Sequence, residues 1–201
     1  FPARSNPFEN AVIDHDGDSE TRKPFSEADI IALNKKIADS DANDELKAIC
    51  KVLELTGCHA KEIALLSASD IHLDAPVPYI RIGVNENRKK LKTGGARHRD
   101  IPLLPEAIEV FKRYPNGVPR YCYAGGPNNF TQSANKLIQS EITDRKTYSW
   151  RHRMVDLLRN HKDVKDDMLK AIVGHNGGQT ADYGEGFDLE NKLEALVRSQ
   201  E

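Results

Sequence analysis

The stretch "VPYIRIGVNENRKKLKTGGARHRDIPL" (residues 77–103) decides the fold class, because its pattern differs from that of its surroundings. Residues 77–84 alternate between apolar and polar side chains, as a half-buried strand does. The remainder predicts two more strands joined by a glycine-rich turn at 93–96. We therefore expect a small antiparallel sheet of three strands.

On both sides of this stretch, apolar residues recur at helical spacing. Ser26, with Asp29 three residues later, gives a capping-box signal for a first helix. Gly57 is placed to end a second helix, and Pro105 to open a later one. The class is mainly α with a small three-stranded antiparallel sheet, an α+β arrangement. Helices after the first are expected at about 43–56, 60–66, 105–113, 128–140, 149–160, 164–173 and 188–199, with a short turn near 178–183.

The composition is that of an ordinary globular chain, since 38% of the 201 residues are hydrophobic and 30% are charged. No apolar run approaches the roughly 20 residues that span a bilayer. Cys50, Cys58 and Cys122 lack metal-site spacing, and scattered thiols are typical of a reducing, intracellular setting. The sequence thus predicts no membrane contact and no structural zinc.

The net charge of −2 conceals two basic blocks, at residues 81–99 and 145–162, each with a single acidic residue. Two such blocks can form one surface for a polyanion such as nucleic acid. They can also be two solvated faces, and charge alone leaves both interpretations open.

Five short motifs follow one another along the chain. They are "TGCHAKEI" (56–63), "LKTGGARHRDIPL" (91–103), "YSWRH" (148–152), "VGH" (173–175) and Tyr183. Each alone is weak, because a lysine on a turn is usually solvated and a histidine at a helix end is more often a cap. Their order and spacing resemble the catalytic domain of the tyrosine recombinase (phage integrase) family, from about Pro24 onward.

The resemblance implies DNA strand cleavage and rejoining by transesterification, through a 3′-phosphotyrosyl intermediate and without ATP, metal or other cofactor. It makes Tyr183 the nucleophile and Lys92 the general acid for the departing 5′ oxygen. Arg151 and His175 would donate hydrogen bonds to the non-bridging phosphate oxygens. Tyr148 stands where many members have His or Lys, and because a phenol is a poor base at neutral pH the base stays unassigned.

The first motif departs from the family at His59, where an arginine normally forms a second phosphate clamp. Histidine lacks the guanidinium fork and is mostly neutral at pH 7 unless its pKa is raised. Losing one preorganised donor typically costs about 10²–10³ in rate. One hypothesis is that the chain, by nature or by design, is impaired in cleavage. The other is that a bound phosphate raises the pKa of His59.

Two neighbours are expected to support the site indirectly. Glu62 either orients residue 59 and its helix or lies on a helix surface. His152 is more consistent with packing than with catalysis.

The resemblance also implies double-stranded DNA of the attachment-site type as the partner. The protein would be a tetramer on DNA, and this fragment would be a monomer in solution. Its setting would be the cytoplasm of a bacterial host. The residues expected to bind DNA are Arg88, Lys89, Lys90, Arg97, Arg99, Arg145, Lys146 and Arg153.

The domain organisation follows from the same comparison. Residues 1–24 resemble a linker from a missing N-terminal DNA-binding module, and residues 25–201 form the catalytic domain. Its C-terminal helix, in 187–201, packs either on its own domain or on a neighbouring subunit.

Two other functions remain open, a catalytically inactive DNA-binding member and a type IB topoisomerase-like enzyme. A metal-dependent nuclease fits poorly, because no Asp and Glu cluster accompanies the Arg and His motifs.

Overall fold

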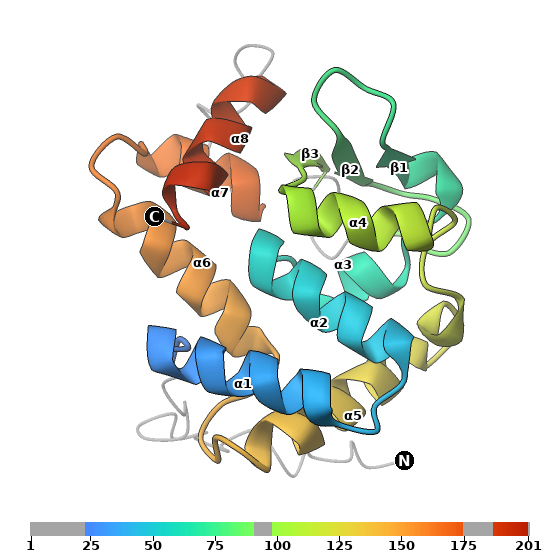
Figure 1. Cartoon of the computed structure of the whole chain (residues 1–201). Coiled ribbons are helices and arrows are strands. Elements are labelled where there is room, and N and C mark those ends of the chain that lie inside the picture. Colours follow the sequence, from blue (N-terminus) through green and yellow to red (C-terminus); the bar gives the residue numbers. More distant parts are fainter. Residues whose placement is uncertain (1–22, 91–97, 175–186, 201) are drawn as a thin grey trace, which may run out of the picture.

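The computed structural model describes residues 23–90, 98–174 and 187–200 (Figure 1). Within these ranges the chain forms eight α-helices and a three-stranded antiparallel sheet, which confirms the predicted class. The helices are α1 (Glu27–Asp39), α2 (Asp44–Thr56), α3 (Ala60–Ala64), α4 (Pro105–Arg113), α5 (Gly126–Gln139), α6 (Tyr148–Asn160), α7 (Asp166–Val173) and α8 (Leu189–Arg198). The strands are β1 (Ile71–His72), β2 (Tyr79–Ile82) and β3 (Arg99–Pro102), and they lie side by side in that order.

Capping residues set the ends of α1 and α2. The Ser26 hydroxyl accepts from the Asp29 backbone N–H at 3.2 Å, and the Asp29 carboxylate accepts from the Ser26 N–H at 2.9 Å. Gly57 ends α2 in the left-handed conformation, with φ of 62°. A Cβ there would lie 2.6 Å from Cβ of Met154, so the close approach of α6 also requires glycine. Both predicted caps are confirmed.

The sheet differs from the prediction in the segments that form it. β2 and β3 pair with Ile80 opposite Ile101, but the third strand is β1, with Ile71 opposite Ile80. The strand predicted at about 88–92 is wrong for residues 88–90, the part that the structure describes, because the chain turns back after β2. Arg88 Nε donates to the Gly83 carbonyl at 2.6 Å, which closes this turn. Residues 91–97, with the predicted turn, lie outside the described ranges, as does the turn near 178–183.

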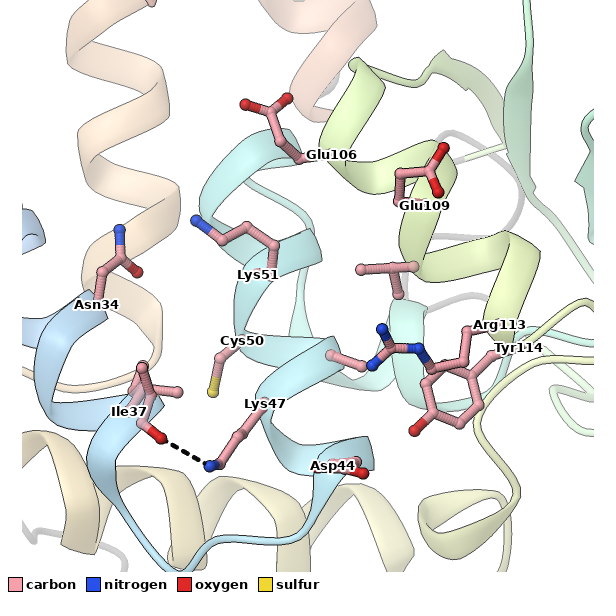
Figure 2. Close-up of a pocket in the computed structure, with 13 residues that line it drawn as sticks. Asn34, Ile37, Asp44, Lys47, Cys50, Lys51, Glu106, Glu109, Arg113 and Tyr114 are labelled. Atoms are coloured by element: carbon pink, nitrogen blue, oxygen red, sulfur yellow. Dashed lines mark hydrogen bonds between the residues drawn. The ribbon is translucent and has the colours of Figure 1, made fainter.

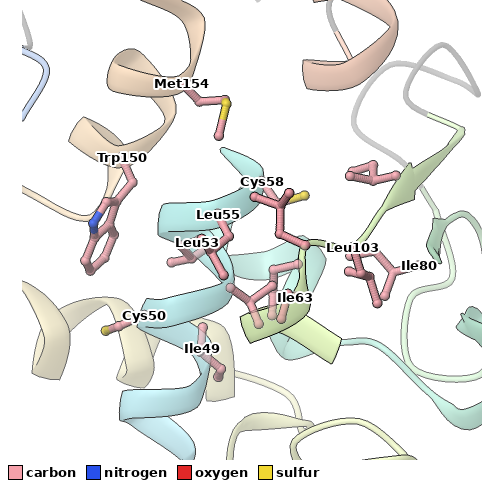
Figure 3. Close-up of a cluster of buried hydrophobic side chains, with 14 of the residues drawn as sticks. Ile49, Cys50, Leu53, Leu55, Cys58, Ile63, Ile80, Leu103, Trp150 and Met154 are labelled. Atoms are coloured by element: carbon pink, nitrogen blue, oxygen red, sulfur yellow. The ribbon is translucent and has the colours of Figure 1, made fainter. Parts of the chain in front are cut away.

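The hydrophobic core lies around α2, which Figure 1 shows between α1, α4 and α6. Figure 3 shows Leu53 and Leu55 of α2 between Trp150 and Met154 of α6 on one side and Ile63 of α3 on the other. Trp150 is 1% exposed and Ile63 is fully buried. This packing brings the first turn of α6 to the junction of α2 and α3, where the polar motifs meet.

The C-terminal helix α8 packs on β3 of its own chain. Leu196 is fully buried, and Lys192 donates to the Asp100 carbonyl at 3.1 Å. This is one of the two arrangements that the sequence left open, and docking on a neighbouring subunit remains a prediction. In the described ranges, no helix combines the length and the apolar character needed to cross a membrane.

Candidate phosphate-binding site

The site begins where α2 ends and α3 starts, in the "TGCHAKEI" motif. The Thr56 hydroxyl donates to the Val52 carbonyl at 2.6 Å and accepts from the Cys58 N–H at 3.3 Å. His59 is the N-cap residue of α3, and its backbone N–H donates to the Glu62 carboxylate at 2.9 Å. Glu62 therefore fixes residue 59 at the start of the helix, in line with the orienting role expected for it.

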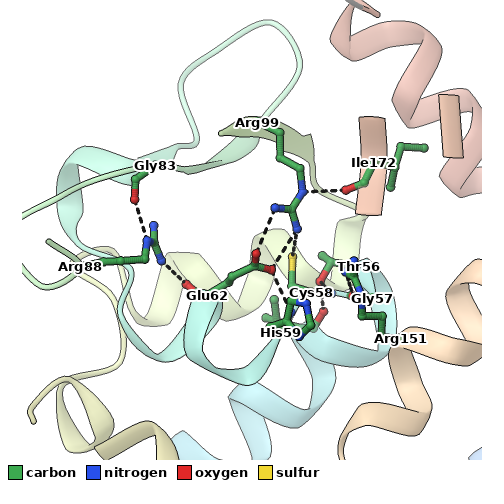
Figure 4. A network of polar contacts seen from close by, with 11 residues as sticks. Thr56, Gly57, Cys58, His59, Glu62, Gly83, Arg88, Arg99, Arg151 and Ile172 are labelled. Carbon is green, nitrogen blue, oxygen red and sulfur yellow. Dashed lines mark hydrogen bonds and ion pairs between the residues drawn. The ribbon is translucent and has the colours of Figure 1, made fainter. Parts of the chain in front are cut away.

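Glu62 is also half of a buried ion pair with Arg99 (Figure 4). Nη2 and Nη1 of Arg99 donate to the two carboxylate oxygens at 2.9 and 3.1 Å, and Nε donates to the Ile172 carbonyl at 2.9 Å. Burial acts to raise the pKa of Glu62, but Arg99 and the His59 N–H outweigh burial and hold that pKa at about 2. The carboxylate is therefore ionised at neutral pH.

Arg88 lies on the other side of Glu62, as Figure 4 shows. Its Nη1 donates to the Glu62 backbone carbonyl at 2.9 Å, in addition to the Nε bond to Gly83. Arg88 is 4% exposed and Arg99 is 7% exposed. The prediction that these two arginines contact DNA is therefore corrected, because both guanidinium groups are buried and bind acceptors inside the protein, although Nη2 of Arg88 is buried without a hydrogen-bond partner among the described residues.

Arg151 of α6 is buried in a different way, at 2% exposure. Its Nη1 donates to the Gly57 carbonyl at 3.0 Å, but Nε and Nη2 are buried without a hydrogen-bond partner in the structure. These two groups form one edge of the guanidinium, the fork that matches two phosphate oxygens. Burial lowers the pKa of Arg151, and the nearby Arg99 acts in the same direction, yet a guanidinium keeps its proton in proteins.

Aromatic rings and a cleft lie beside the start of α6. The Tyr148 ring lies with its centroid 5.4 Å from that of His59 and 4.8 Å from that of His152. His59 and Tyr148 line the cleft, which has a volume of about 690 Å³ between α3, α5 and the start of α6. Its lining also carries Lys61 and Lys146, and Lys23 and Asp144, which form an ion pair at 3.1 Å. Of the predicted catalytic residues, the structure thus places His59 and Tyr148 together in the cleft, while Arg151 binds the Gly57 carbonyl, two residues before His59.

The other predicted site residues fall into three groups. Lys92, Arg97, His175 and Tyr183 lie outside the described residues. Arg145 and Arg153 bind the segment before α1, through the carbonyls of Pro24 at 2.8 Å and Phe25 at 3.3 Å. Three of the described residues that were predicted to bind DNA have exposed side chains, namely Lys89, Lys90 and Lys146.

Sequence reasoning did not find the roles of Arg88, Arg99, Arg145 and Arg153 inside the protein. A basic segment that faces solvent and a basic segment whose arginines bind acceptors inside the protein have the same composition. One available signal was Glu62 itself, because a carboxylate needs a cationic partner when it is buried.

The arrangement can bind a singly or doubly charged oxyanion. Burying a charged donor without a partner costs about 1–3 kcal/mol or more, so two such groups on one residue favour a ligand that pairs with both. Among the described residues there is no group of three or more His, Cys, Asp and Glu side chains that could hold a metal ion.

A second cavity, of about 390 Å³, lies between α1, α2 and α4 (Figure 2). Its charged lining is mixed, so it has no evident preference for an anion. Lys47 in this cavity donates to the Ala38 carbonyl at 2.9 Å. The charged residues that line it are Asp44, Lys47, Lys51, Glu106, Glu109 and Arg113.

Known proteins resemble this chain in structure more than in sequence. No protein-family model and no curated protein match the sequence. The integrase from mycobacterium phage Brujita superposes with a TM-score of 0.65 at 13% identity, over 88% of this chain and 57% of that protein. An integrase of the Tn1549 transposon, solved with transposon right end DNA, gives a TM-score of 0.58 at 18% identity, over 97% of this chain and 71% of that protein.

A third similar structure is that of the XerH site-specific recombinase bound to a palindromic difH substrate. It gives a TM-score of 0.53 at 12% identity, over 89% of this chain and 50% of XerH. The chain thus spans about half the length of XerH and 57% of the Brujita integrase. The chain has the catalytic-domain fold of the tyrosine recombinases and integrases, as the five motifs predicted.

Proposed function

We propose that the chain is the catalytic domain of a site-specific DNA recombinase that breaks and rejoins strands through a phosphotyrosine. The observation that carries the proposal is the buried Arg151, whose Nε and Nη2 have no hydrogen-bond partner among the described residues and whose Nη1 binds the Gly57 carbonyl, two residues before His59. The integrase fold and the order of the five motifs support the same conclusion.

In the proposed reaction, the Tyr183 oxygen attacks phosphorus and the bond from phosphorus to the 5′ oxygen breaks. The leaving oxygen takes a proton from the Lys92 ammonium, and the phenol proton passes to solvent or to a neighbouring base. Arg151 and His175 stabilise the charge that grows on the non-bridging oxygens. Rejoining reverses these steps with a 5′ hydroxyl as the nucleophile, so no ATP is consumed and no metal is required.

The proposed partner is duplex DNA, on which the whole protein would act as a tetramer. Lys89, Lys90 and Lys146 are exposed and would contact phosphates on either side of the reacting one. A chain with few such contacts should bind weakly, lose affinity steeply with salt and remain monomeric in solution. In that assembly α8 would exchange its packing on β3 for a neighbouring subunit.

The test uses a pool of DNA duplexes with randomised sequence around a central 5′-bridging phosphorothiolate, which traps a covalent intermediate. We expect a denaturant-stable adduct that mass spectrometry assigns to Tyr183. Tyr183→Phe should abolish the adduct. Tyr123→Phe, at a half-exposed tyrosine, is the matched control and should retain it. An absence of adduct, or an adduct on another residue, would contradict the proposal.

A catalytically inactive DNA-binding protein is the second candidate, and His59 is the observation that favours it. His59 lines the cleft beside Tyr148 where the family has an arginine. Comparing His59→Arg with the unaltered protein on the same duplexes separates the cases. An adduct only in the variant indicates an inactive binder, and a gain of about 10²–10³ in rate indicates an impaired enzyme. Equal rates show that His59 causes no impairment.

A further inference from the structure

The segment just before α1 lies against α6, the helix that carries Arg151. The Phe25 ring has its centroid 5.4 Å from that of Trp150, and the two ring planes are inclined at 55°. Phe25 is 2% exposed and Trp150 is 1% exposed. Arg153 donates to the Phe25 carbonyl at 3.3 Å, so α6 holds this residue through both its ring and its backbone.

The two residues of α6 that hold Phe25 lie on one face of the helix. Trp150 and Arg153 are three positions apart, which makes them neighbours on the helix surface. Arg153 also forms an ion pair with Glu27 in the first turn of α1. The contact therefore has two points of attachment along α6, and it resists rotation of the helix about its axis as well as separation from the segment.

The start of α6 lacks the side-chain cap that commonly fixes a helix end. Thr147 is its N-cap residue, and its side chain makes no capping hydrogen bond to a described residue. The Thr147 backbone N–H donates instead to Asn135 of α5 at 2.8 Å. Arg145, two residues earlier, donates to the Pro24 carbonyl at 2.8 Å. The position of this helix end thus depends on contacts with other segments, and residues 24–25 supply part of them.

Another face of α6 packs on the end of α2 and carries Arg151. Arg151 Nη1 donates to the Gly57 carbonyl at 3.0 Å, and a Cβ on Gly57 would lie 2.6 Å from Cβ of Met154. α6 is therefore held between residues 24–25 and the end of α2. The setting of the helix between them decides where Nε and Nη2 of Arg151 lie, because these groups have no hydrogen-bond partner among the described residues.

We propose that Phe25 and Arg153 are positioning residues for Arg151 in its contact with the reacting phosphate. The inference rests on the proposed function, since it takes Arg151 as the group that binds this phosphate. A displacement of about 1 Å at a reacting group can cost about 10²-fold in rate. Loosening one side of α6 leaves the guanidinium in the site but impairs its placement, so the loss should be smaller than that of Arg151→Met.

The experiment is a double-mutant cycle on single-turnover adduct formation, at saturating concentrations of a phosphorothiolate duplex selected from the reactive pool. Phe25→Leu removes the ring pair but keeps an apolar side chain, and Arg153→Met removes the hydrogen bond and the charge. Each should slow adduct formation about 10-fold on its own. In the Arg151→Met background each should slow it by no more than about twofold, because the group that they position is gone.

The matched control is Phe111→Leu, at a fully buried ring on α4. It makes the same substitution away from α6, so it should leave the rate of adduct formation unchanged in both backgrounds. Thermal unfolding identifies any variant that fails to fold. Arg153→Met keeps the test decisive if Phe25→Leu is such a variant, because the Arg153 side chain is 18% exposed and its loss empties no part of the core.

The outcomes separate positioning from other roles. A variant that slows the reaction equally in both backgrounds acts on folding or on DNA directly, and one that slows it in neither has no role in the reaction. Either result would overturn the positioning role of that residue while the proposed function stands. If the unaltered protein forms no adduct, the proposed function fails and the positioning role fails with it.

Discussion

Arg99 and Arg151 are both buried guanidinium groups near the junction of α2 and α3, but their surroundings differ. In Arg99, Nε, Nη1 and Nη2 all have acceptors, two of them the oxygens of Glu62. In Arg151, Nη1 alone has an acceptor, the Gly57 carbonyl. One arginine is neutralised by the fold, and the other is a buried charge to which no carboxylate of the described residues is hydrogen-bonded.

This difference separates a structural cation from a functional one. A buried ion pair loses stability when one partner is removed, because the remaining charge is uncompensated. A buried cation without a counter-ion already costs stability, so a fold that retains it gains in ligand binding or catalysis. Arg99 should therefore matter most for folding and Arg151 most for reactivity.

The largest expected effect tests the structural side of the comparison. Arg99→Met should lower the free energy of unfolding by about 3–5 kcal/mol, because Glu62 then remains buried without its cation. Chemical denaturation measures this change. Adding Glu62→Gln removes the stranded charge, so the double variant should be more stable than Arg99→Met alone. A double variant that is less stable would contradict the account of the pair.

The next effect tests the functional side. Arg151→Met should slow adduct formation on the phosphorothiolate duplexes by about 10²–10³, because the phosphate loses two hydrogen-bond donors. The free energy of unfolding should change by no more than about 1 kcal/mol, since a buried charge is removed together with its one bond to Gly57. If Arg151→Met unfolds the protein as Arg99→Met does, the distinction between the two arginines is wrong.

A third prediction concerns the pH dependence of stability that the ion pair between Glu62 and Arg99 produces. Burial acts to raise the pKa of Glu62, but Arg99 holds it at about 2, below the value in the unfolded chain. The unfolded state therefore binds the proton first, and the stabilisation is present above pH 5 and lost as the pH falls from about 5 to 2. It amounts to roughly 3 kcal/mol. Acid titration of stability measures it, and Glu62→Gln should flatten the curve in this window.

The sequence was informative wherever local chemistry decides the outcome. The Ser26 capping box, the Gly57 stop and the Pro105 start depend on residues within one helical turn, and the structure confirms them. The helix that contains Trp150 and Arg151 was also predictable, because its apolar residues recur at helical spacing. The motif order likewise indicated the fold that the similar integrases have.

The sequence was uninformative where partners lie far apart along the chain. Whether Arg99 faces solvent or Glu62 depends on tertiary packing, and the same holds for Arg145 and the Pro24 carbonyl. The described part of the predicted strand, residues 88–90, failed for a related reason, since Arg88 reaches α3 and turns the chain away from the sheet. Local pattern cannot distinguish a basic residue on a strand from one that closes a turn.

The smallest expected effect compares an exposed lysine with an anchored arginine from the two basic blocks. Lys89 is exposed, whereas Arg145 donates to the Pro24 carbonyl and pairs with Asp144. Lys89→Gln should reduce the slope of log affinity against log salt by about 1, as the loss of one phosphate contact does. Arg145→Gln should leave that slope unchanged, because its charge is already paired with the carboxylates of Asp144 and Asp29. Fluorescence anisotropy with a labelled duplex between about 50 and 200 mM salt measures both slopes. An equal change in the salt slopes of the two variants would mean that Arg145 leaves its partners to bind DNA. The contacts within the protein would then not limit which basic residues reach the duplex.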